Sequence, residues 1–143
     1  MGKLETIWIK RFKRGPMDAV SVANIIENRG IENNADQNGK RQITIIEKEK
    51  WQKMMNELEC DLDPSARRSN LLVSGISLSN STGKILSIGN CRVKVFGETR
   101  PCERMDEAFD GLKAVMAKNW NGGIFGVIVN GGTIRTGDKV NFI

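Results

Sequence analysis

Short apolar segments separated by turn-forming residues dominate the second half of this sequence. Three of them, 70–76, 84–88 and 91–96, are bounded by Gly, Ser or Asn, and two more follow at 124–129 and 140–143. Segments of roughly four to eight residues between such boundaries are typical of β-strands, because each strand ends where a tight turn begins. The pattern therefore restricts the chain to a sheet or barrel built from many short strands.

The first half of the chain adds further strands and a loop. Residues 7–12 alternate in polarity and then meet a Gly-Pro pair, which predicts a strand that ends in a turn. Residues 20–26 are apolar enough for either a strand or a helix. Residues 27–40 are rich in Asn, Gly and Asp and predict a long polar loop, and a short strand is expected at 42–46.

Two segments have the spacing of amphipathic helices. Apolar residues between Trp51 and Leu58 repeat at helical intervals, and Asp63 with Pro64 is expected to end that helix. A second helix is predicted over 106–119. Many short strands with two helices predict an α+β, β-rich fold, a barrel-like sheet with a few helices.

The composition excludes several classes of chemistry. At 143 residues the chain has the size of one domain, and we expect residues 1–143 to fold as a single unit. The chain has no histidine, which excludes Ser-His-Asp and Cys-His catalysis and His-rich zinc sites. Cys60, Cys91 and Cys102 are too widely spaced for a Cys-x-x-Cys site or a disulfide framework. Cys91 is expected in the core, since it lies on one strand face with Val93 and Val95.

Charge and hydropathy limit the partners and the location. Lys and Arg exceed Asp and Glu by 22 to 17, so the net charge of +5 favours anionic ligands. The excess is modest, and we do not expect nucleic acid as the partner. No apolar run approaches the roughly 20 residues that a membrane helix needs. Unpaired cysteines fit a reducing compartment, so we expect a cytoplasmic protein without membrane contact.

The segment 100–105, Arg-Pro-Cys-Glu-Arg-Met, combines three features that favour a thiolate. Cys102 follows a proline-fixed turn, lies between Arg100 and Arg104, and precedes a predicted helix. A thiolate can ligate a soft metal such as molybdenum or attack sulfane sulfur, and arginines can bind phosphate. A loop cysteine with solvated arginines is the alternative that the local sequence leaves open.

Several motifs occur in a characteristic order along the chain. They are Gly30-Ile31, Arg41-Gln42-Ile43-Thr44, Arg67 through Ile76, Ile88-Gly89, Pro101 through Met105, Gly123 through Val129, Gly132 and Gly137 through Val140. Their order and spacing resemble those of MOSC domains, the C-terminal domains of molybdenum-cofactor sulfurases. The resemblance covers nearly the whole chain from about Val20 onward and implies the MOSC β-fold.

The resemblance also implies a site. In the family the cysteine of the Pro-Cys element, here Cys102, is the proposed sulfur-carrying or molybdenum-ligating residue. The arginine of the Arg-x-Asn element, here Arg68, lines the pocket for the anionic pterin phosphate, with Asn70 beside it. Arg41 and Arg104 are further candidates for binding the cofactor, which would be the molybdenum cofactor (molybdopterin). Without the family, Arg68 would be interpreted as a surface charge and Asn70 as a strand-start cap.

One segment departs from the family pattern. Many members carry a Gly-Asp-x-His-like element in the polar loop, where this chain has residues 32–37 without histidine and with the acidic group displaced to Asp36. Because this loop can form a wall of the pocket, the departure implies an altered cofactor affinity or activity. Residues 1–143 contain no aminotransferase-like or electron-transfer domain, so a sulfur donor or an electron-transfer partner protein is expected.

Three functions follow from these observations. The first is a protein that binds the molybdenum cofactor or carries sulfur, with Cys102 as metal ligand or persulfide carrier. The second is a small molybdenum-dependent reductase of N-hydroxylated compounds that receives electrons from an external reductase. The third is a non-catalytic module that escorts the cofactor, or a basic domain that binds nucleic acid.

Overall fold

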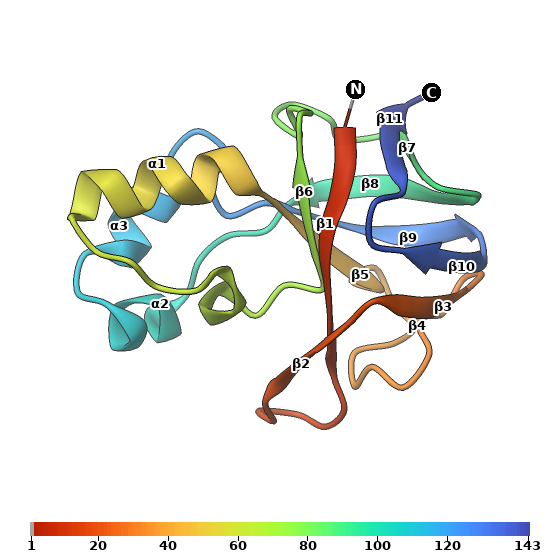
Figure 1. Ribbon diagram of the computed structural model, residues 1–143, viewed down its shortest axis with the longest axis horizontal. Coiled ribbons are helices and arrows are strands. Elements are labelled where there is room, and N and C mark those ends of the chain that lie inside the picture. Colours follow the sequence, from red (N-terminus) through yellow and green to blue (C-terminus); the bar gives the residue numbers. More distant parts are fainter. Residues whose placement is uncertain (1) are drawn as a thin grey trace.

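The computed structural model describes residues 2–143 and shows a closed β-barrel with helices beside it (Figure 1). Seven strands form the barrel, and pairing of β1 with β11 closes it, with Gly2 opposite Val140. In order around the barrel the strands are β11 (Lys139–Phe142), β7 (Ile85–Ile88), β8 (Cys91–Glu98), β9 (Ile124–Asn130), β5 (Ile43–Glu47), β6 (Leu71–Ser74) and β1 (Gly2–Lys10). The predicted β-rich, barrel-like α+β fold is confirmed.

Four short strands lie outside this ring. Strand β2 (Met17–Val20) pairs only with β1, while β10 (Gly132–Arg135), β3 (Val22–Ile26) and β4 (Gly30–Ile31) form a separate three-stranded sheet. The segment 20–26, which the sequence left open between strand and helix, is therefore extended. The predicted polar loop is confirmed, except that two of its residues pair as β4.

The helices gather on one side of the barrel, at the left of Figure 1. They are α1 (Lys48–Leu58), the 3₁₀ helix η1 (Pro64–Arg67), α2 (Glu103–Ala108) and α3 (Leu112–Met116). No helix within residues 2–143 combines the length and the apolar character needed to cross a membrane.

Two helix predictions need correction. The single helix expected over 106–119 is two short helices, because Phe109 takes an extended conformation and Gly111 has φ 92°, which interrupts the helical backbone. The first helix ends at Leu58, where Glu59 turns into the left-handed region with φ 52°. Asp63 does not end that helix but begins η1 instead.

Two apolar clusters hold the fold together. One fills the barrel, and the other lies between the barrel wall and the helices. Successive strand residues point to opposite faces, so Leu71 contributes to the first cluster and Leu72 to the second. The same alternation explains Trp8, which packs with the helices while Ile7 and Ile9 face the barrel interior. Both faces of these strands are therefore buried, one in the barrel interior and the other against the helices, and this packing holds the helices on the barrel wall.

Candidate functional site

The turn that precedes β6 positions two consecutive arginines. Asp63 starts it by accepting a hydrogen bond at Oδ2 from the Ser65 N–H at 2.9 Å, and Pro64 fits the first helical position because it has no N–H to satisfy. Arg68 ends η1 in the left-handed region with φ 64°. The Arg67 and Arg68 guanidiniums therefore reach different parts of the fold.

Arg67 is buried, with 8% of its surface exposed. Its Nε donates to the carbonyl oxygen of Gly122 at 3.1 Å and its Nη2 to that of Thr99 at 3.2 Å. Burial lowers the pKa of Arg67 to about 10, the Cys102 thiolate opposes that fall, and Arg41 adds to it. Arg67 remains cationic at neutral pH, so it is a fixed charge close to Cys102.

Cys102 lies at the junction between β8 and α2. It is the residue that precedes the first turn of α2, and its thiol is exposed and free. The thiol makes no capping hydrogen bond to the helix, so it is not consumed by a structural role there. A negative charge on Cys102 raises the pKa of Arg67 against the effect of burial, and it raises the pKa of Lys113 after the larger contributions of Glu103 and Asp106.

The other arginines of the predicted site lie in the same neighbourhood. Arg68 Nη2 donates to the Gly15 carbonyl oxygen at 2.6 Å. Burial lowers the pKa of Arg68, and the neighbouring charge of Arg104 lowers it further. The Arg41 guanidinium lies close enough to Arg67 to lower its pKa. These influences connect Arg67 with Cys102 and with Arg41, and Arg68 with Arg104; we name these four arginines the arginine cluster.

The arginine cluster has no internal counterion. Across residues 2–143, none of its four members forms a salt bridge with a carboxylate. Asp36 raises the pKa of Arg68 but pairs with Lys10 at 2.5 Å. Four positive charges without a carboxylate partner favour an anionic ligand.

Asn70 is buried and fully hydrogen-bonded. Its Oδ1 accepts from the Thr44 N–H and hydroxyl at 3.1 and 3.2 Å, and its Nδ2 donates to the Trp8 carbonyl and to Asn34 Oδ1 at 3.3 and 3.2 Å. These four bonds use every position that a side-chain amide offers. A direct contact between Asn70 and a ligand would require one of them to be exchanged, so in this structure Asn70 holds the start of β6 in place.

The polar loop that departs from the family pattern lies against the site. Asn34 is buried, and its Oδ1 accepts from the Lys10 N–H at 2.9 Å as well as from Asn70. Asp36 acts electrostatically on Arg68. The expectation that this loop borders the site is thus supported at Asn34 and Asp36.

A buried hydroxyl in the segment between β8 and Cys102 has no partner. Thr99 Oγ1 is the only buried side-chain N or O atom within residues 2–143 that makes no hydrogen bond. Thr99 also holds Arg67 through its carbonyl oxygen. An unpaired buried hydroxyl costs about 1–3 kcal/mol, which a polar ligand atom would offset. The exposed thiol and the arginines without carboxylate partners fit a cofactor that offers an anionic group and a soft metal.

Sequence reasoning missed Arg67 and Thr99. Arg68 was singled out and its neighbour Arg67 was not, because two adjacent arginines give no signal of which one is buried. The left-handed backbone of Arg68 sets the different directions of the two side chains. A positive φ in a residue other than glycine cannot be predicted from the sequence. Thr99 carries no motif signal of its own.

The remaining cysteines have structural positions. Cys91 is buried on the inner face of β8, as expected, and burial raises the pKa of its thiol. Cys60 is half-buried, with its Sγ 3.5 Å from the Met55 Sδ. Within residues 2–143 no three Cys, Asp or Glu side chains gather as a metal site.

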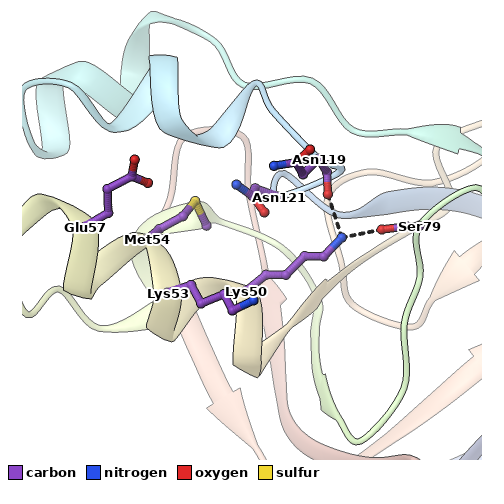
Figure 2. A pocket seen from close by; sticks show the side chains of 7 residues that line it. All are labelled: Lys50, Lys53, Met54, Glu57, Ser79, Asn119 and Asn121. Carbon is purple, nitrogen blue, oxygen red and sulfur yellow. Dashed lines mark hydrogen bonds between the residues drawn. The ribbon is translucent and has the colours of Figure 1, made fainter.

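A separate cavity lies between α1 and two loops (Figure 2). Its volume is about 370 Å³, and none of the arginine cluster lines it. Lys50 crosses it and donates to the Ser79 hydroxyl and to the Asn119 carbonyl, the latter at 2.6 Å. Its Nζ also lies 3.3 Å from a Glu47 carboxylate oxygen, so the lysine ties α1 to both loops.

The fold and the site define a class of small β-barrel proteins that present a cysteine beside clustered arginines. The family pattern of the MOSC domain matches residues 18–141. The chain therefore belongs to the MOSC domain family. A search of curated proteins gave no match.

Solved structures share the fold at low sequence identity. YuaD from Bacillus subtilis superposes with a TM-score of 0.81 at 18% identity, covering 99% of this chain and 96% of that one. YiiM from Geobacillus stearothermophilus gives 0.77 at 14% identity, with 100% of this chain and 75% of that chain covered. YiiM from Escherichia coli gives 0.74 at 17% identity, with 99% and 69% covered. These likenesses establish the fold.

Proposed function

We propose that the arginine cluster binds the molybdenum cofactor and that Cys102 serves as its metal ligand or as a persulfide carrier. The observation that carries this proposal is that Arg67 is bonded to the segment leading to the exposed Cys102 thiol, while none of the four arginines forms a salt bridge with a carboxylate within residues 2–143. Family membership supports the choice of ligand. When bound, the cofactor supplies a molybdenum centre whose redox and sulfur chemistry no side chain can provide.

Each residue has a distinct part in this proposal. Arg41, Arg68 and Arg104 would donate charge-assisted hydrogen bonds to the phosphate of the pterin. Arg67 is held by two carbonyl oxygens and contributes a fixed positive charge. Cys102 offers a soft sulfur ligand, which molybdenum accepts.

The source of sulfur or electrons is a partner protein in this proposal. The cysteines are free, which agrees with action in the reducing cytoplasm. Reduction of N-hydroxylated compounds would use the same site and add electrons from an external reductase. Escort of the cofactor would use the arginine cluster without chemistry at Cys102. Redox turnover by the cofactor-loaded protein would indicate the reductase, and its absence would indicate escort of the cofactor.

The decisive experiment is metal and pterin analysis of protein purified from a molybdenum-replete host. The wild-type protein should carry molybdenum and pterin in comparable amounts, and Arg104→Gln should carry less of both. Arg11→Gln is the matched control, because Arg11 is exposed and bonded to Asp18 rather than placed in the arginine cluster. Wild-type protein with neither molybdenum nor pterin contradicts the proposal.

A further inference from the structure

Two phenylalanines stack on the outer face of the barrel next to the arginine cluster. Phe96 of β8 and Phe125 of β9 have ring centroids 6.1 Å apart and ring planes 19° apart. Each ring also carries a cation: Lys40 Nζ lies 5.1 Å from the Phe96 centroid, and Arg41 Cζ lies 5.2 Å from that of Phe125. We name these four side chains the cation–aromatic ladder.

The backbone of β8 places the Phe125 ring. The register between β8 and β9 shifts between Val95 and Gly97, which sets Gly97 opposite Phe125. A Cβ at Gly97 would lie 3.5 Å from the Phe125 Cε1, in ordinary contact. The ring therefore lies over a residue without a side chain, where it is half-buried and supported by the exposed Phe96.

Arg41 needs support at this position. Its guanidinium is exposed, and its charge lowers the pKa of the fixed Arg67, so the two like charges repel. No carboxylate within residues 2–143 forms a salt bridge with Arg41. The cation–π contact with the Phe125 ring is therefore the favourable interaction that holds this guanidinium.

We propose that Phe125, braced by Phe96, is a positioning residue that holds Arg41 for the anionic ligand of the arginine cluster. An aromatic face attracts a cation through its quadrupole but leaves the cation its full charge. A carboxylate in the same place would pair with Arg41 and cancel the potential that draws an anion. The inference rests on the proposed function only in requiring that the ligand of this site is anionic.

The test measures the affinity for inorganic pyrophosphate by isothermal titration calorimetry at low ionic strength. Phe125→Leu should weaken binding about two- to five-fold, which corresponds to the loss of an exposed cation–π contact. Phe125→Tyr keeps the ring face and should bind as the wild type does. Arg41→Gln should weaken binding more. In an Arg41→Gln background, Phe125→Leu should have no further effect, because Phe125 acts through Arg41.

A matched control comes from another cation over a ring. Lys84 Nζ lies 5.6 Å from the centroid of Phe142, between β7 and β11, so Phe142→Leu removes the same kind of contact at a place outside the arginine cluster. Its pyrophosphate affinity should equal that of the wild type. Pyrophosphate binding that Phe125→Leu leaves unchanged, or weakens equally in the Arg41→Gln background, overturns the positioning role alone. A wild-type protein that does not bind pyrophosphate overturns the anionic site and, with it, the proposed function.

Discussion

Arg67 donates through Nη2 to the carbonyl oxygen of Thr99, which lies in the segment that leads from β8 to Cys102. With the second bond to Gly122, this contact links η1 to the segments that enter α2 and β9. Two hydrogen bonds to backbone carbonyls hold this buried guanidinium in one position, so it does not reorient when a ligand binds. Arg67 thus gives the site a fixed positive charge, while the more exposed Arg41 and Arg104 can adjust to the ligand.

The first prediction concerns the reactivity of the cysteines. Cys102 should alkylate faster than Cys60 or Cys91 at neutral pH, because it alone is exposed and it lies beside the arginine cluster. Cys91 should react last, since burial and then Asp138 raise the pKa of its thiol. Peptide mapping after limited iodoacetamide treatment measures the order. Earlier modification of Cys91 would show that β8 does not bury it in solution.

The second prediction concerns the buried amide of Asn70. Asn70→Ala should lower the free energy of unfolding by at least about 2 kcal/mol, because it removes four side-chain hydrogen bonds and leaves the Thr44 N–H without its acceptor. Urea denaturation measures this change. The matched control is Asn24→Ala, which removes an exposed hydrogen bond from Thr133 and should cost less than about 1 kcal/mol. Equal losses would argue against the buried network.

The third prediction separates affinity from stability at Arg68. Arg68→Ala should weaken cofactor binding by about 1.5–3 kcal/mol through loss of a charge-assisted hydrogen bond. It should also lower stability modestly, because the bond to the Gly15 carbonyl is lost. Arg68→Gly should lose the same affinity but less stability, since glycine relieves the φ of 64°. Cofactor titration and urea denaturation of both variants provide the measurements, and unchanged affinity would place Arg68 outside the pocket.

The fourth prediction concerns the cap that starts η1. Hydrogen bonds from the Ser65 hydroxyl and N–H lower the pKa of Asp63 below 3.8. Its carboxylate therefore contributes stability that is present above about pH 3.8 and is lost as the pH falls through the lower folded value. Asp63→Ala should cost about 0.5–2 kcal/mol at pH 7, whereas Asp63→Asn keeps a cap. Urea midpoints at pH 7 and at pH 3 should show a smaller pH effect in Asp63→Asn than in the wild type.

The sequence predicted most strands because turns and alternation are local signals. Residues 84–88 and 91–96 were assigned within two residues of their ends, since Gly89 and Asn90 mark the turn between them. The prediction of one helix over 106–119 was wrong because its apolar spacing continues across Gly111, whose φ of 92° interrupts the helical backbone. An added Cβ at Gly111 would lie 3.4 Å from the Leu58 Cδ2, so the positive φ rather than a clash is what favours glycine there.

The candidate site was only partly predictable for a related reason. Cys102 and Arg68 stand in motifs, so a resemblance can find them. Arg67, Thr99 and Phe125 contribute through burial, an unpaired hydroxyl and a ring face, and these properties arise from long-range contacts. A single sequence contains no record of such contacts, because β8, β9 and η1 meet only after the barrel closes.

The last prediction distinguishes a metal ligand from a sulfur carrier at Cys102. Cys102→Ser keeps the size of the side chain nearly constant but replaces a soft sulfur with a hard hydroxyl that stays protonated at neutral pH. The fold should be unaffected, because the thiol is exposed and makes no capping bond to α2. Pterin bound by the arginine cluster should therefore be retained.

The two roles then give different losses. If the thiolate holds molybdenum, the Ser variant should retain pterin and lose metal, as measured by elemental analysis. If Cys102 carries sulfur, the variant should keep its metal and lose the sulfur that cyanide releases as thiocyanate. We expect loss of metal, because the other cysteines, buried Cys91 and half-buried Cys60, are poorly exposed for resolving a persulfide at Cys102. A variant that keeps full molybdenum and full cyanide-releasable sulfur would remove Cys102 from the chemistry and leave the arginine cluster as a binding site alone.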